Sequence, residues 1–229
     1  MSKFIVVEGL DGSGKSTQMK LLREFLNTRD TAFKYLHFPR TDAPVFGDLI
    51  SRFLRGEMGD NQTVDPYLIA LIYAGDREAA SRQILQWLDG DYLVIVDRYV
   101  YSNIAFQCAK LDERDEQKKL SDWIKMLEYE HYNIPKPDLN IFLDVPFSFT
   151  KKNLERERRG EDRNYLNGKE DIHEKDIEFQ ERVRQIYLEE SKDNDDLLII
   201  SCSDENGEMY KPGRIFEKII QTMSTYRIL

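Results

Sequence analysis

Five short runs of apolar and β-branched residues recur along the chain, separated by stretches long enough for helices. Runs such as LVIV and LLII lack alternating polar residues, which is typical of central strands covered by helices on both faces. The expected strands are residues 4–7, 33–38, 92–96, 139–143 and 197–201. Because strands alternate with helix-length segments, the pattern predicts a five-stranded parallel sheet in a three-layer α/β/α sandwich.

Helical spacing of apolar residues is clearest over 65–88, where Pro66 suits a first turn, and over 174–190. A further helix is expected over 15–27. The highly charged segment 151–175 is the one break in composition, and we interpret it as an insertion rather than a domain boundary. With 229 residues and no internal repeat, we expect a single domain over 1–229.

Charge and cysteine content narrow the function classes. The formal net charge of −9 argues against a nucleic-acid partner, because such partners are bound by clustered Lys and Arg. Two cysteines far apart, Cys108 and Cys202, predict neither a disulfide framework nor a cysteine metal site, and favour a reducing compartment, by default the cytoplasm. No apolar run approaches the length of a membrane span, so we expect neither a signal peptide nor a membrane anchor.

A phosphate-binding loop, Gly9-x-x-x-x-Gly14-Lys15-Ser16, follows the first apolar run directly. In such a loop, backbone N–H groups point at phosphate oxygens, the lysine neutralises the β- and γ-phosphates and the hydroxyl of the following residue ligates Mg²⁺. The sequence therefore predicts an ATP–Mg²⁺ site. The residues expected to hold the ATP phosphates are Gly9, Asp11, Gly12, Ser13, Gly14, Lys15, Ser16 and Thr17.

Further candidates follow the other strands, because ligands of open α/β sheets bind at the carboxyl ends of the strands. Asp97 is expected to hold Mg²⁺ opposite Ser16, although a helix cap is the alternative. Asp144 is a weaker metal candidate, and capping of the helix after Pro146 is favoured. Arg98 provides the planar donor that a kinase needs to grip an acceptor phosphate.

Two other arginines are open to either of two interpretations. Arg40 follows the second strand and Arg77 lies on the helix over 65–88. Each could contact a substrate, or merely pair with a surface carboxylate.

Several segments together resemble the thymidylate kinase family from end to end: GLDGSGKST (9–17), FPR (38–40), YAGDRE (73–78), DRYVYSNIAFQ (97–107) and RERRGEDR (156–163). The segment DRYVYSNIAFQ is the most specific of these. The resemblance implies a fold like that of P-loop NTP hydrolases, a homodimer, and phosphorylation of dTMP to dTDP by ATP–Mg²⁺. It also implies dimer contacts through helices over 45–56, 65–88 and 100–108.

The resemblance also implies roles for individual residues toward dTMP. Tyr73 would stack on thymine, Arg77 would donate to its O4 and Ser102 would meet the base edge. Arg98 and Arg40 would bind the phosphate. Asp11 would approach the 3′-hydroxyl or the metal, and Phe106 would crowd the 2′ position. The expected dTMP set is Asp11, Phe38, Arg40, Leu54, Tyr73, Arg77, Arg98, Ser102, Phe106, Gln107 and Tyr165.

Some members of that family carry an arginine inside the phosphate loop, where this chain has Gly12. The resemblance then implies that a mobile lid around 151–170 supplies the cation. Arg156 and Arg159 are expected to reach the transferring phosphate, and Tyr165 the nucleotide. The alternative is that the lid arginines pair with neighbouring acidic residues on a solvated face.

Phosphoryl transfer depends on positioning and charge neutralisation, and the acceptor phosphate is already anionic, so no general base is assigned. The expected catalytic residues are Lys15, Asp97, Arg98, Arg156 and Arg159. Other functions compatible with the sequence are a kinase for a different nucleoside monophosphate or deoxynucleoside, and a nucleotide-dependent switch protein. The pair His173-Glu174 is not a zinc-protease signature because position 177 is Ile, which favours ion pairing or capping.

Overall fold

The computed structural model describes residues 2–155 and 161–229, and the side chains of 161–163 are not among the described parts. Its centre is a five-stranded sheet in the order β2-β3-β1-β4-β5, with every neighbouring pair parallel. The strands are β1 (Lys3–Glu8), β2 (Phe33–His37), β3 (Leu93–Asp97), β4 (Leu139–Asp144) and β5 (Leu197–Ser201). Each apolar run of the sequence thus forms a strand, which confirms the predicted α/β class and parallel sheet.

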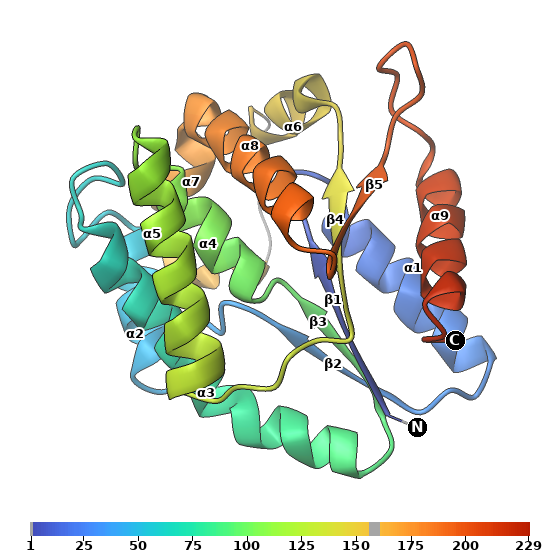
Figure 1. The fold of residues 1–229 in the computed structure, drawn as a ribbon. Coiled ribbons are helices and arrows are strands. Elements are labelled where there is room, and N and C mark those ends of the chain that lie inside the picture. The colour runs from blue at the N-terminus through green and yellow to red at the C-terminus, as the bar shows by residue number, and fades with distance from the viewer. Residues whose placement is uncertain (1, 156–160) are drawn as a thin grey trace.

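Helices cover both faces of this sheet. Figure 1 shows α1 (Lys15–Thr28) and α9 (Pro212–Thr225) on one face, and α3 (Pro66–Asp89), α4 (Val100–Cys108), α5 (Arg114–Lys125) and α8 (Ile177–Asp193) on the other. Because successive strand residues point to opposite faces, Phe4 and Val6 of β1 pack in one apolar core, whereas Ile5 and Val7 pack in the other. The three predicted layers are therefore present.

The remaining elements lie near the carboxyl ends of the strands or join the larger helices. They are α2 (Phe46–Leu54), the π-helix η1 (Met126–His131), α6 (Phe147–Leu154), the 3₁₀ helix η2 (Glu161–Leu166) and α7 (Ile172–Lys175). Several hydrogen bonds connect the charged segment to the rest of the protein, and two of them reach the site's surroundings. Asn153 Nδ2 donates to the Gly12 carbonyl at 2.7 Å, and Arg55 Nη1 donates to the Tyr165 carbonyl at 2.7 Å. This segment therefore contacts both the phosphate loop and the end of α2.

The helix predicted over 65–88 is present as α3, and Asp65 caps its N-terminus by accepting from the Tyr67 N–H at 2.8 Å. The helix predicted over 174–190 is present mainly as α8, but its predicted start is wrong, because α7 ends at Lys175 and α8 begins at Ile177. Asp176 separates them with an extended backbone and accepts from the Phe179 N–H at 2.9 Å. No helix in the described part of the chain is long and apolar enough to cross a membrane.

Candidate active site

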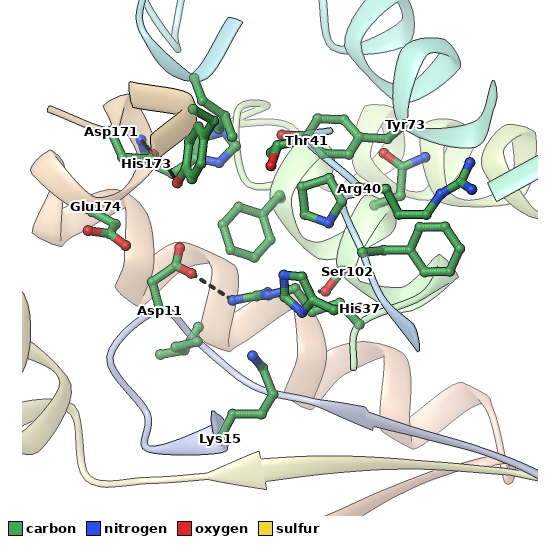
Figure 2. Close-up of a pocket in the computed structure, with 18 of the residues that line it drawn as sticks. Asp11, Lys15, His37, Arg40, Thr41, Tyr73, Ser102, Asp171, His173 and Glu174 are labelled. Atoms are coloured by element: carbon green, nitrogen blue, oxygen red, sulfur yellow. Dashed lines mark hydrogen bonds and ion pairs between the residues drawn. The ribbon is translucent and has the colours of Figure 1, made fainter. Parts of the chain in front are cut away.

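A cavity of about 1020 Å³ opens at the carboxyl ends of β1, β2 and β3. Its walls come from the phosphate loop, the loop after β2, the helices α3 and α4, and the segment around α7 (Figure 2). The predicted residues that line it are Asp11, Gly12, Ser13, Gly14, Lys15, Ser16, Phe38, Arg40, Leu54, Tyr73, Arg77, Arg98, Ser102, Phe106, Gln107 and Tyr165. Segments far apart in the sequence thus meet at the edge of the sheet where the sequence places the site.

Three predicted residues in the described part of the chain do not line this cavity. Gly9 and Thr17 belong to the phosphate loop but do not line the cavity, and neither does Asp97, which is ion-paired with Lys15. Arg156 and Arg159 lie outside the described residues, so their predicted roles stay predictions.

The phosphate loop has the backbone shape that an anion site requires. Gly12 and Gly14 have φ of 74° and 82°, in the left-handed region that residues with a Cβ rarely adopt. Gly14 then leads into α1, whose first N–H groups have no partners within the helix and which carries partial positive charge at this end. Ser13 Oγ is buried without a hydrogen-bond partner in the described structure. The loop therefore offers unsatisfied donors to a phosphate group.

Lys15 and Asp97 form a buried ion pair, with Nζ 2.9 Å from Oδ1. Burial lowers the pKa of Lys15, and the Asp97 carboxylate partly offsets this effect. Burial also raises the pKa of Asp97, but Lys15 and His37 outweigh it and hold that pKa below its usual range. The Asp97 carboxylate is therefore ionised and paired with Lys15. The alternative that Asp97 caps a helix is wrong, because the N-cap residue of α4 is Tyr99.

Arg98 has a left-handed backbone, with φ of 67°, which is costly for a residue with a side chain. Its N–H donates to the Val7 carbonyl at 3.0 Å. The guanidinium donates from Nη2 to Asp11 at 2.7 Å and from Nη1 to the Ser102 hydroxyl at 3.1 Å, and it lies 5.1 Å above the Phe106 ring. These contacts hold Arg98 at the cavity wall, beside the phosphate loop.

A buried carboxylate, Glu8, lies beneath the first turn of α4. Its Oε1 accepts from the N–H groups of Tyr99 at 2.9 Å and Ser102 at 3.2 Å. A side chain of β1 therefore satisfies N–H groups at the start of α4. Its Oε2 lies 2.6 Å from the Ser102 hydroxyl and 2.9 Å from the Tyr187 hydroxyl. The single hydroxyl proton of Ser102 is thus directed to Glu8, which leaves Ser102 better suited to supporting Arg98 than to donating to a base.

Arg77 is completely buried and pairs with the equally buried Glu128, with Nη2 2.7 Å from Oε1 and Nε bonded to Oε2. The simpler interpretation from the sequence, a surface carboxylate partner, is therefore wrong. Tyr73 lies one helical turn before Arg77, and both line the cavity. Arg77 Nη1 makes no hydrogen bond to the described residues, so it remains available to a ligand.

Asn103 is a cavity residue that the sequence analysis missed. Its Nδ2 donates to the Ala70 carbonyl and to Glu128 Oε1, both at 3.0 Å, whereas its Oδ1 is buried and accepts from none of the described residues. Gln107, one turn further along α4, also has an unpartnered buried acceptor, Oε1. The four-residue spacing between Asn103 and Gln107 within DRYVYSNIAFQ was the signal available in the sequence.

Arg40 is held by Asp76, which is buried. The Arg40 Nε donates to Asp76 Oδ1 at 2.9 Å, Nη2 donates to the Asp76 carbonyl at 2.7 Å, and the Arg40 backbone N–H donates to Oδ2 at 2.9 Å. The predicted alternative of pairing with a carboxylate is thus partly right, but the partner is not on the surface. Arg40 still lines the cavity.

The wall opposite Lys15 comes from the segment around α7, which the sequence analysis assigned no site role. The His173 ring is buried against Phe106, Phe53 and Phe179, with ring centroids 5.0, 5.4 and 5.4 Å away. Burial lowers its pKa to about 3, so the imidazole is neutral. Asp171 accepts from the Tyr165 hydroxyl at 2.8 Å.

Asp144 lies at the end of β4, where its carboxylate is paired with an arginine and does not cap a helix. Its carboxylate forms two hydrogen bonds with Arg184, at 2.6 and 2.9 Å. The favoured prediction of capping is wrong, because α6 begins after Pro146 without a side-chain cap. A cation 40 residues away competes successfully for this carboxylate.

Comparisons with known proteins agree with this geometry. The family model for thymidylate kinase matches residues 7–211. The chain is 33% identical over 186 residues to a thymidylate kinase of Mycobacterium tuberculosis, covering 81% of this chain and 84% of that protein. It is also 33% identical over 219 residues to a probable thymidylate kinase 1 of Saccharolobus solfataricus, covering 95% and 98%.

A solved structure of thymidylate kinase from Candida albicans superposes with a TM-score of 0.71 at 27% identity, covering 99% of this chain and 92% of that one. The matched residues include the phosphate loop from Gly9 onward and all the cavity walls described above. The chain therefore belongs to the thymidylate kinase family.

Proposed function

We propose that the cavity binds dTMP beside ATP, in the ATP-dependent phosphorylation of dTMP to dTDP that membership of this family assigns to the chain. The observation that carries the proposal is the division of the cavity into two parts. A cationic part contains Lys15 and Arg98, and an enclosed part contains Tyr73, Arg77 and an unpartnered acceptor. These parts suit a phosphate and a base, respectively.

In the enclosed part, the Tyr73 ring would stack on thymine, a contact worth about 1–3 kcal/mol per base. Arg77 Nη1 would donate to O4, and Asn103 Oδ1 would accept from N3–H. A donor from Arg77 beside an acceptor from Asn103 fits thymine, which has an acceptor at O4 and a donor at N3–H. Support comes from the hydrogen bonds that already occupy the other polar atoms of Arg77 and Asn103.

Between the two parts, Asp11 and Phe106 flank Arg98 and would contact the sugar. We assign the acceptor phosphate to Arg98 and Arg40, because charge-assisted bonds from a planar guanidinium suit phosphate oxygens. Phe106 would crowd the 2′ position and so disfavour ribonucleotides. Phe38, Leu54, Gln107 and Tyr165 complete the proposed dTMP wall.

At the phosphate loop, the N–H groups after Gly14 would hold the ATP phosphates, and Lys15 would leave Asp97 to neutralise the transferring group. Arg156 and Arg159 would add positive charge from the lid. The Ser16 hydroxyl and the Asp97 carboxylate are hard oxygen donors of the kind that Mg²⁺ prefers, so they fit that ion. When bound there, Mg²⁺ would neutralise charge on the phosphate oxygens.

We propose a homodimer and a cytoplasmic location. The exposed apolar side chains of α3, Leu68 (59% exposed), Leu71 (40%) and Leu85 (44%), lie on a helix from the expected dimer surface. The two cysteines are buried and free, which suits a reducing compartment.

The test is ADP release from ATP–Mg²⁺ with dTMP, dUMP, UMP, dCMP, dGMP, AMP and thymidine offered separately. We expect dTMP to give the highest kcat/KM and UMP to be disfavoured by Phe106. A higher kcat/KM for another monophosphate or for thymidine would refute the proposed base contacts. ATP turnover that no acceptor stimulates would instead favour a switch protein.

A further inference from the structure

Glu128 is a buried carboxylate that does not itself line the cavity. Its Oε1 accepts from Arg77 Nη2 at 2.7 Å and from Asn103 Nδ2 at 3.0 Å, and its Oε2 accepts from Arg77 Nε. Both donors belong to cavity residues, one on α3 and the other on α4. One carboxylate therefore joins the two side chains assigned to the base edge.

We propose that Glu128 is a positioning residue that determines the choice of thymine over cytosine, an inference that rests on the proposed function. An ionised carboxylate only accepts hydrogen bonds, so the Asn103 side chain must direct Nδ2 toward it. The Ala70 carbonyl, also an acceptor, imposes the same orientation. Asn103 then presents Oδ1, an acceptor, on its other side.

The same carboxylate orients Arg77. Because it occupies Nε and Nη2, the guanidinium fork is fixed in its plane and Nη1 is the remaining donor. A fixed donor beside a fixed acceptor matches O4 and N3–H of thymine. Cytosine carries a donor at N4 and an acceptor at N3, so both contacts would be mismatched.

The cost of this arrangement supports a functional role. Arg77 is 2% exposed and Glu128 is 0% exposed, and buried ion pairs of this kind often stabilise a protein less than an apolar pair of the same size. Glu128 also lies in the π-helix η1, where the Tyr132 N–H bonds to the Leu127 carbonyl at 2.8 Å. Single π-turns occur frequently at functional sites.

The experiment measures kcat and KM for dTMP and dCMP in the wild-type protein and in Glu128→Gln. A Gln places an N–H₂ group where Arg77 or Asn103 needs an acceptor, so one of the two loses its orientation. We expect the ratio of kcat/KM for dTMP to that for dCMP to fall by about tenfold or more. The fall should come mainly from a higher KM for dTMP, because the transferring phosphate binds at the other part of the cavity.

The matched control is Glu130→Gln, an exposed carboxylate on the same π-helix, which should leave the ratio unchanged. Because Glu128→Gln leaves Arg77 without a counter-ion and can unfold the protein, Glu128→Asp is tested in parallel. Asp keeps the charge but shortens the side chain, and we expect a folded protein whose ratio falls several-fold.

An equal loss of activity with both substrates would show that Glu128 only stabilises the fold, and would overturn this inference. An unchanged ratio in a folded Glu128→Asp would do the same. A wild-type protein that phosphorylates dCMP as well as dTMP would instead overturn the proposed base contacts themselves, and this inference with them.

Discussion

Asp171 and His173 are expected to affect the stability of the protein in opposite directions as the pH changes. Burial and the negative charges of Asp11 and Glu174 raise the pKa of Asp171 to about 7, from an ordinary value of 3.8. Burial, together with the positive charge of Lys110, lowers the pKa of His173 to about 3, from 6.5. The two side chains are two residues apart, and the Asp171 carboxylate accepts from the His173 N–H at 2.8 Å.

The sign of each effect follows from proton uptake by the folded and unfolded chains. As the pH rises from about 4 to 7, the unfolded chain releases the Asp171 proton and the folded protein keeps it, so the free energy of unfolding falls by about 4 kcal/mol. As the pH falls from about 6.5 to 3, the unfolded chain protonates His173 and the folded protein does not. That also lowers the free energy of unfolding, by about 5 kcal/mol.

Between about pH 4 and 6.5 these two slopes oppose each other and nearly cancel. Replacing one residue should therefore expose the slope of the other. We expect Asp171→Asn to gain about 1.4 kcal/mol of unfolding free energy relative to wild type for each unit by which the pH rises across this interval. The reason is that Asn does not titrate, so the variant lacks the loss of stability that Asp171 causes in the wild type. His173→Phe, which keeps an aromatic ring among Phe53, Phe106 and Phe179, should shift the slope the other way.

The assay is urea unfolding at pH 4.5, 5.5, 6.5 and 8 for wild type and both variants, with the exposed Asp193→Asn as a control. The informative quantity is how the difference in unfolding free energy between variant and wild type changes with pH. A constant difference for Asp171→Asn from pH 4.5 to 8 would refute the argument, because it would mean that Asp171 has the same pKa in the folded and unfolded states.

Three further predictions concern the site and its supports. Lys15→Ala removes the cation paired with Asp97, and ADP release with dTMP should fall about 10²–10³-fold at an unchanged circular dichroism spectrum; a loss under tenfold would remove Lys15 from the mechanism. Tyr187→Phe keeps the ring but removes a hydrogen bond to Glu8, so urea unfolding should show a loss of about 1.5–3 kcal/mol, and equal stability would contradict the importance of that bond. Leu68→Asp should yield monomers in sedimentation velocity, whereas a monomeric wild-type protein would refute the proposed dimer.

The fold was largely predictable because central strands of a parallel sheet are apolar on both faces and are therefore visible as uninterrupted runs. All five runs form strands, with ends shifted by no more than one residue. The start of α8 was predicted three residues too early, at residue 174, because a side-chain cap at Asp176 leaves no mark in the spacing of apolar residues. Only the hydrogen bond from the Phe179 N–H to the Asp176 side chain shows that a new helix begins there.

Placement in the cavity was predictable where a motif or a strand end marks the residue, as for Lys15 in the phosphate loop and Arg98 after β3. What could not be predicted was the partner of each charged side chain. Arg77 pairs with Glu128, 51 positions away, and Asp144 pairs with Arg184, 40 positions away. Such pairings depend on how helices pack across the sheet, and no local pattern in the sequence encodes them.

These pairings explain how a chain with a net charge of −9 can offer positive charge to two anionic substrates. Three cavity arginines are each held at two nitrogens: Arg40 at Nε and Nη2 by Asp76, Arg77 at Nε and Nη2 by Glu128, and Arg98 at Nη1 and Nη2 by Ser102 and Asp11. In each case the third nitrogen is fixed in direction before a ligand arrives, so little side-chain entropy is lost on binding. A lysine carries its three donors on one rotating nitrogen, so an anchoring bond does not fix the direction of the other two. The acidic partners therefore orient the arginines that we assign to substrate binding, and an Arg-to-Lys substitution at any of the three positions should remove this fixed orientation.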